Sequence, residues 1–221
     1  MKIPKDIGQE LSLTRKDPSY IAAVQFPQSF YGKFEDIIDS IKDDPKEIIR
    51  YTRYLEKEIR GSYEYKSFLE FLKTHAEWRK CSLLEGVSSE DASIELHHFP
   101  FTMFDICRIV LNSIIIDKKD CSSFDIISAI VKLHFDNKVG LVPLSSTVHS
   151  LVHDGKLTLS LANIYGDWQS FAEEYFYAMT KEDHERIHSL IDISCKPEMF
   201  EVNNKVLKVS LKMLSKEIQY D

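Results

Sequence analysis

Apolar residues recur every three or four positions along most of the chain, which is the spacing of helices with one buried face. Between these stretches, apolar and polar residues alternate over a few short runs, as they do in strands. The pattern therefore predicts a mostly helical α+β protein. The expected helices run from Pro45 to about Ile59, from about 63 to 79, from Thr102 through Ile115, from Ser122 or Ser123 through His134, from Asp167 through Met179, and from Thr180 through Ile191.

Several helix starts are marked by side chains that can accept hydrogen bonds from the free amides of a first turn. Asp44 followed by Pro45 suits an N-cap and the first helical position. Thr180 and Asp183 have the spacing of a capping box. These local signals predict where the helices begin.

A glycine-containing turn separates the first two expected strands, which predicts that they pair with each other in antiparallel fashion. The third strand is short and apolar, and it leads into a helix that a serine is expected to cap. The expected strands are 80–84, 93–98, 141–144 and 156–161.

The two ends of the chain are less regular. Residues 1–33 contain three prolines and are expected to form an arm that packs on the domain through an aromatic group. A short helix is expected over 34–41, and the alternation over 206–218 fits a strand or a helix equally well. The aromatic group comprises Tyr20, Phe26, Phe30 and Tyr31.

Composition narrows the class of protein. The chain has 221 residues and is 43% hydrophobic, enough for one elaborated domain or two small ones. It lacks an apolar run of the roughly 18 to 20 residues that a membrane span needs, and no signal-peptide core is visible. We therefore expect a cytoplasmic protein with no membrane partner. The net charge of −7 argues against a protein dedicated to coating nucleic acid.

Four histidines stand at the points where predicted elements begin or end. His97 and His98 close the 93–98 strand, while His149 and His153 are four apart and share one face of the helix that follows 141–144. Three such nitrogens can hold one metal ion and leave a position open for water, with the fourth histidine free to move a proton. The other histidines, including His134, are expected to be packed side chains.

Three further groups of residues have a functional and a simpler interpretation. Ser145, Ser146 and Thr147 stand beside His149, where helix capping is favoured over a nucleophile. The basic residues between 50 and 80 could face DNA or a protein, but acidic residues interleave with them, which favours a solvated face. The aromatic residues between 165 and 177 could stack bases, but their helical spacing favours core packing.

The order of strand, histidine pair, apolar strand and His-x-x-x-His helix resembles the HNH, or ββα-metal, nucleases. The likeness is greatest to the all-histidine sites of colicin DNases, in which a glutamate stands two residues before the pair, as Glu95 does here. Residues 97–102 and 139–149 also resemble HNH-like proteins of large tailed phages. The resemblance covers about 93–156. It implies a ββα-metal core embedded in a mostly helical domain, with a helical insertion over 102–137 between the two halves.

The resemblance also implies roles for individual residues. His97, His149 and His153 would hold one divalent ion (Zn, Mg, Mn or Ni), and His98 would be the general base. Glu95 would form a structural ion pair with an arginine. The family usually has an asparagine before the second strand to orient the base, whereas this chain has Gly140, so that Asn137 or a backbone carbonyl would have to substitute.

Two functions follow from this resemblance. The first is a metal-dependent endonuclease that cleaves DNA, more than RNA, to a 5′-phosphate and a 3′-hydroxyl. The second is an inactive HNH-like phage module that binds nucleic acid, or a protein through its added helices; its location would be the host cytoplasm. We divide the chain into a helical region with its arm (1–80), the HNH-like core (81–165) and a C-terminal helical region (166–221).

Overall fold

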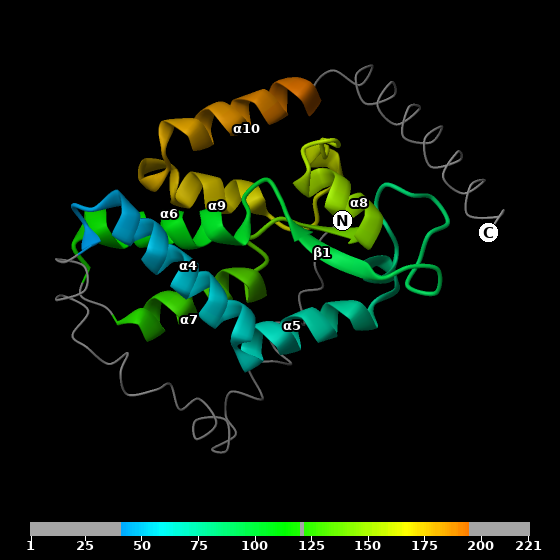
Figure 1. Cartoon of the computed structure of the whole chain (residues 1–221), viewed down its shortest axis with the longest axis horizontal. Helices are drawn as coiled ribbons and strands as arrows, with labels where there is room; N and C mark the ends of the chain where they lie inside the picture. Colours follow the sequence, from blue (N-terminus) through cyan, green and yellow to red (C-terminus); the bar gives the residue numbers. More distant parts are fainter. Residues whose placement is uncertain (1–40, 120–121, 195–221) are drawn as a thin grey trace.

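The structure is a computed structural model that describes residues 41–119 and 122–194, and these residues form a mostly helical α+β fold with one small sheet (Figure 1). The predicted α+β class is confirmed at this level. The N-terminal arm, nearly all of the expected 34–41 helix and the 206–218 segment lie outside the described residues. The α-helices are α4 (Pro45–Gly61), α5 (Tyr63–Thr74), α6 (Met103–Asp117), α7 (Ser123–Phe135), α8 (Ser146–His153), α9 (Trp168–Glu174) and α10 (Lys181–Ser194). The 3-10 helices are η2 (Ala76–Arg79), η3 (Leu161–Asn163) and η4 (Phe176–Ala178).

Most predicted helix starts are confirmed by capping hydrogen bonds. The Asp44 carboxylate accepts from the amide of Lys46, 2.9 Å away, and Pro45 occupies the first turn. Thr102 and Ser122 form capping boxes with the aspartates three residues later. Ser145 stands at the cap position of α8, but its hydroxyl makes no capping hydrogen bond. The prediction that a serine side chain caps this helix was therefore wrong.

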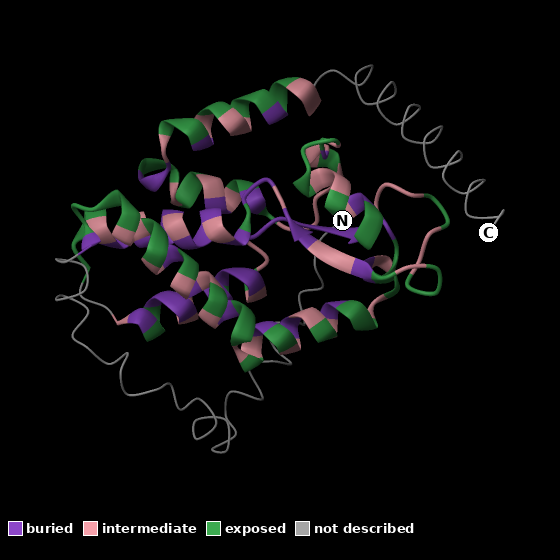
Figure 2. Cartoon of the chain, viewed as in Figure 1, coloured by how far each residue is buried: buried purple, intermediate pink, exposed green. Residues whose placement is uncertain are grey.

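The main core lies where α4 crosses α6 and α7, with α5 against the far end of α7 (Figures 1 and 2). The inward stripe of α4, which includes Leu55 and Ile59, is completely buried. Burial of this apolar stripe supplies the main stabilisation of helices whose outer faces remain polar. The fully buried side chains include Phe68, Leu72, Ile106, Leu111, Ile126 and Ile130.

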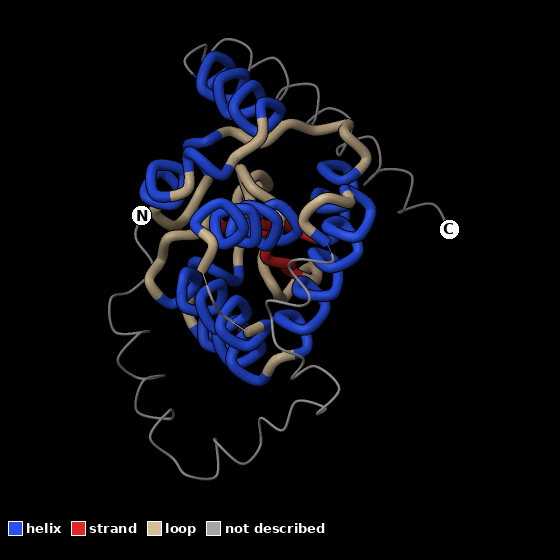
Figure 3. The backbone as a smooth tube through the Cα atoms, turned by 90° about the vertical axis from the view of Figure 1, so that its left-hand side faces the viewer, coloured by secondary structure: helices blue, strands red, loops and turns tan. Residues whose placement is uncertain are grey.

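The sheet consists of β1 (Ile94–His98) and β2 (Leu141–Ser145), paired antiparallel with His98 opposite Leu141 and Ile94 opposite Ser145. Helix α8 follows β2 without a loop and packs across both strands. A second small core fills the space around this unit and includes Val142, Leu144 and Val148. Figure 3 shows the two strands enclosed between helices. Helices α6 and α7 occupy the chain between the strands, where helices were expected.

The predicted pairing of 80–84 with 93–98 was wrong. Residues 80–84 form no strand, only an isolated bridge between Lys80 and Ser88. β1 pairs instead with β2, every residue of which is buried. Ser82 donates its amide to Pro143 O (2.8 Å), so the segment that was expected to pair with β1 attaches to β2. Burying the apolar strand β2, which is distant in sequence, therefore stabilises the fold more than a hairpin between β1 and the nearer segment 80–84 would.

Two other boundaries differ from prediction. The helix expected over 63–79 breaks at His75, which is extended. The side chains of Thr74 and His75 both contact Phe71 O, the carbonyl that the amide of residue 75 would need to continue the helix. Residues 156–161 form no strand. Their alternation reflects side-chain packing, with Leu159 buried, and within residues 41–119 and 122–194 no strand pairs with them.

None of the helices in the described part of the chain combines the length and apolar character needed to cross a membrane. The three-part domain division stays a prediction.

Candidate metal centre

Three of the four motif histidines converge between β1 and α8. His97, His149 and His153 each offer a ligand atom, and these atoms lie within 4.8 Å of one another. The ring centroids are 5.0 Å apart for His97 and His149, 5.0 Å for His97 and His153, and 4.5 Å for His149 and His153. The three rings are nearly perpendicular in pairs, at 75°, 79° and 84°. Each ring thus brings one nitrogen close to a nitrogen of the other two.

Local structure explains this convergence. Residues four apart on a helix share a face, so α8 presents His149 and His153 together. The fully buried Val148 fixes that helix against the sheet, and His97 points from β1 toward it. His97 is buried, whereas His149 is half-buried and His153 is exposed. The cluster therefore has a closed side at the sheet and an open side at the helix.

Glu95 completes the arrangement from the same face of β1, since side chains two apart in a strand point the same way. Its Oε2 lies 2.6 Å from Nδ1 of His149. A carboxylate only accepts, so Nδ1 carries the proton and the lone pair of Nε2 faces Nε2 of His153 at 3.1 Å. Glu95 has no arginine partner within the described ranges, so that the expected arginine ion pair is replaced by a contact with His149.

The surroundings of His97 and His149 favour their neutral forms. Burial, together with the neighbouring His149 and His153, lowers the pKa of His97 to about 4. Burial also lowers the pKa of His149, and His153 adds to this effect, whereas Glu95 opposes it. Neutral imidazole is the form that binds metal ions, so the lowered pKa values of His97 and His149 favour metal binding at neutral pH.

His98 does not join this cluster. Successive side chains of a strand point to opposite faces, and His98 points toward α5 and α7. There it is 5% exposed, stacks on Tyr65 at 6.3 Å, and places its Nε2 3.0 Å from Nε2 of His134. Burial, with help from His134, holds the pKa of His98 well below its usual range. The residue expected to be the general base is thus enclosed in the helical core.

His134 orients His98 and was not recognised from the sequence, where it was interpreted as a packed side chain. It is completely buried, and its Nδ1 donates to Ile130 O at 2.8 Å. Its Nε2 is therefore the acceptor, and His98 must donate from its own Nε2. Tyr65 and Phe68 contact the His134 ring edge-on. No sequence signal linked the two histidines, which are 36 residues apart and on different elements.

A match to a family model shows the family of the chain. The model of the bacteriophage G278-like virion proteins matches residues 5–219. The chain belongs to this family. Neither a curated protein nor a solved structure matches the chain. The association with bacteriophages that the sequence predicted is confirmed by the family.

In this virion protein, glycine at position 140 is dictated by packing. A Cβ atom there would lie 2.0 Å from Phe99 O and 2.8 Å from the side chain of Ile164. The amide of Phe99 donates to Gly140 O at 3.1 Å, so the two backbone segments are in direct contact. An asparagine could not occupy this position.

Asn137 does not replace that asparagine in the virion protein. It adopts a left-handed conformation (φ 61°), and its carbonyl accepts from the amide of Asp167 at 2.7 Å. Its Oδ1 is buried beside Gly166 without a hydrogen bond. Among the described residues, no hydrogen bond joins Asn137 to His98. The hydrogen-bond partner of His98 is His134 instead.

Proposed function

We propose that this virion protein is a metal-binding, HNH-like module that acts in the particle by binding rather than by cutting. In this proposal β1, β2 and α8 form the ββα-metal unit, and His97, His149 and His153 hold one divalent ion. The observation that carries it is the convergence of three imidazoles from two elements, with Glu95 fixing the tautomer of one of them.

The geometry fits a metal that prefers nitrogen ligands. Two ligands at about 2.0–2.1 Å from a tetrahedral ion lie about 3.3–3.4 Å apart. The Nε2 atoms of His149 and His153 are 3.1 Å apart, close to this value. Imidazole ligands suit zinc and nickel, whereas magnesium prefers oxygen. We therefore favour zinc or nickel over magnesium.

Binding is favoured over hydrolysis because of the position of His98. A general base must reach water or substrate, and His98 is buried with its Nε2 occupied by His134. The net charge of −7 also disfavours a polyanionic partner. The partner that fits best is another protein of the virion.

The second candidate function is the HNH-type cleavage of DNA. Three protein ligands leave a coordination position open, and the exposed His153 places that position near solvent. A bound ion would supply charge stabilisation at the cleaved phosphate. For hydrolysis, His98 would have to leave His134 and take a proton from the attacking water.

A plasmid-nicking assay with Mg²⁺, Mn²⁺, Ni²⁺ and Zn²⁺ separates the two candidates. Wild type would be compared with His98→Ala and His149→Ala. The binding module predicts no nicking by wild type in any metal. Nicking that disappears in both variants would establish the endonuclease and refute our proposal.

A further inference from the structure

The same seven-residue motif opens two helices that are distant in sequence. Thr-x-x-Asp-x-x-Arg occurs as Thr102, Asp105 and Arg108 in α6, and again as Thr180, Asp183 and Arg186 in α10. In each copy the aspartate and threonine form a capping box: the threonine amide donates to the carboxylate at 3.0 Å in α6 and at 2.9 Å in α10. Each motif thus supplies a cap and, one turn later, an arginine.

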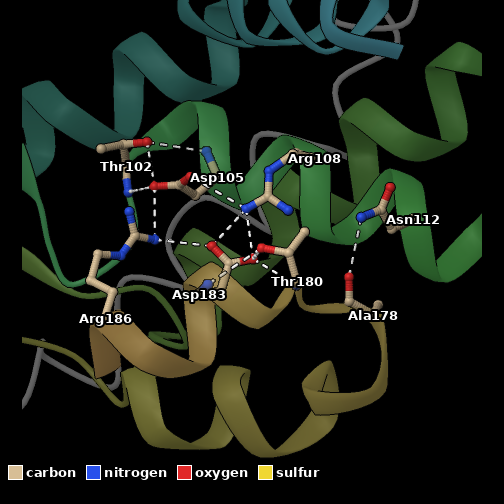
Figure 4. Close-up of polar contacts among 8 residues, drawn as sticks. All are labelled: Thr102, Asp105, Arg108, Asn112, Ala178, Thr180, Asp183 and Arg186. Carbon is tan, nitrogen blue, oxygen red and sulfur yellow. Dashed lines mark hydrogen bonds and ion pairs between the residues drawn. The ribbon is translucent and has the colours of Figure 1, made fainter. Parts of the chain in front are cut away.

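The two copies bind each other (Figure 4). Nη2 of Arg108 lies 2.7 Å from both carboxylate oxygens of Asp183. In the reciprocal contact, Nη2 of Arg186 lies 3.1 Å from Asp105. Each arginine also contacts the aspartate of its own helix, at 3.4 Å for Arg108 and 3.3 Å for Arg186. The same contacts are thus made in both directions between the two helices. We name these six residues the clasp: Thr102, Asp105, Arg108, Thr180, Asp183 and Arg186.

The clasp is balanced in charge, and its two carboxylates are removed from water. Asp183 is 3% exposed and Asp105 is 9% exposed. Nη1 of Arg108 and Nε of Arg186 are buried without a hydrogen-bond partner. Desolvation of such a group offsets much of the Coulombic attraction, so the clasp specifies one docking geometry while adding modest net stability.

Within the described residues, α10 contributes little buried surface apart from the clasp, although Ile187 packs against the main core. Of its fourteen residues, only Asp183 and Leu190 are buried. At its far end, Ser194 Oγ accepts from the amide of Leu161 at 3.3 Å. Figure 1 shows α10 along the outside of the helical layer. A helix with this little buried apolar surface depends on its polar contacts for docking.

Helix α10 contacts the chain segments that follow β1 and α8, the two elements that carry the three histidines. Arg186 lies over the ring of Phe101, three residues beyond β1, at 5.9 Å from the ring centre. Leu161 follows α8 through a short connection. The position of α10 is therefore tied to the segments that follow both histidine-bearing elements.

We propose that α10 is a detachable strap, which the clasp holds closed and which opens as a unit without unfolding of the core. Opening would uncover Phe101, which is 3% exposed in the closed state, and the first turn of α6. The proposal does not depend on metal binding.

Hydrogen–deuterium exchange on the full chain tests the strap, because amides report the free energy of local opening. In wild type, amides of α10 are expected to exchange at least tenfold faster than those of α7. Arg108→Gln and Asp183→Asn should each raise α10 exchange by a further tenfold and leave α7 unchanged. Lys181→Gln, which removes an exposed charge from the same helix, should have no effect.

Three results would overturn the strap. The first is equal exchange of α10 and α7 in wild type. The second is a clasp variant that accelerates all helices alike. The third is failure of both clasp variants to fold, because the clasp would then be needed by the whole domain.

Discussion

Glu95 Oε2 lies 2.6 Å from Nδ1 of His149, and this contact determines which nitrogen of the histidine faces the cluster. The carboxylate holds the Nδ1 proton, leaving Nε2 free as a ligand. Contacts of this kind orient metal-binding histidines in many proteins, and their loss commonly costs about 10–100-fold in affinity.

Glu95→Gln should therefore weaken zinc binding by about 10–100-fold, because an amide holds the imidazole less firmly than a carboxylate. Competition against a chromophoric chelator measures this affinity. Glu85→Gln, which removes an exposed glutamate from a nearby turn, is the matched control and should bind as wild type does. Equal affinities for the two variants would remove Glu95 from the site.

The buried His134 predicts a loss of stability in acid. Its pKa falls from 6.5 to about 4 in the folded protein, so the unfolded chain binds the proton more tightly. The free energy of unfolding should then be undiminished above pH 6.5 and fall as the pH drops toward 4. The shift corresponds to about 3 kcal/mol for this group.

Urea denaturation at pH 7 and pH 4.5, with EDTA present, checks this. His134→Gln should lose less stability between the two pH values than wild type, although it starts from a lower value at pH 7. His188→Gln, at an exposed position, should retain the wild-type difference. An unchanged pH dependence in His134→Gln would show that another group is responsible.

Gly140→Ala should destabilise the fold, because the new Cβ would lie 2.0 Å from Phe99 O, a backbone atom that cannot move alone. Overpacking of this kind costs about 1–3 kcal/mol. Gly61→Ala is the control, since nothing lies within 4 Å of its added Cβ. Thermal denaturation of both variants gives the comparison; equal melting temperatures would mean that β1 and β2 separate easily at this point.

Local signals in the sequence predicted much of this fold. Three of these signals depend on residues within one turn of each other: Asp44 with Pro45, the cap at Thr102 and the capping box at Thr180. The same holds for His149 and His153, which share one helical face. The approach of His97 to that helix was expected through the HNH resemblance, and the structure places the three side chains together.

Contacts between distant segments were harder to predict. The choice of β2 over 80–84 as the neighbour of β1 depended on which strand could be buried on both faces. The bond between His98 and His134 joins a strand to a helix, and only tertiary packing brings the two rings together. Part of the clasp was predicted, namely the helix start at Thr102 and the capping box at Thr180, but not the contact between the two helices.

The central claim is one metal ion held by three named histidines, and the metal content of the purified protein tests it most directly. After zinc loading and desalting, we predict one equivalent in wild type, His98→Ala and His188→Ala, and much less than one in His97→Ala, His149→Ala and His153→Ala. Metal binding should also raise the melting temperature only where the three ligands are intact. Wild type without metal, or full stoichiometry in folded His149→Ala, would contradict the account.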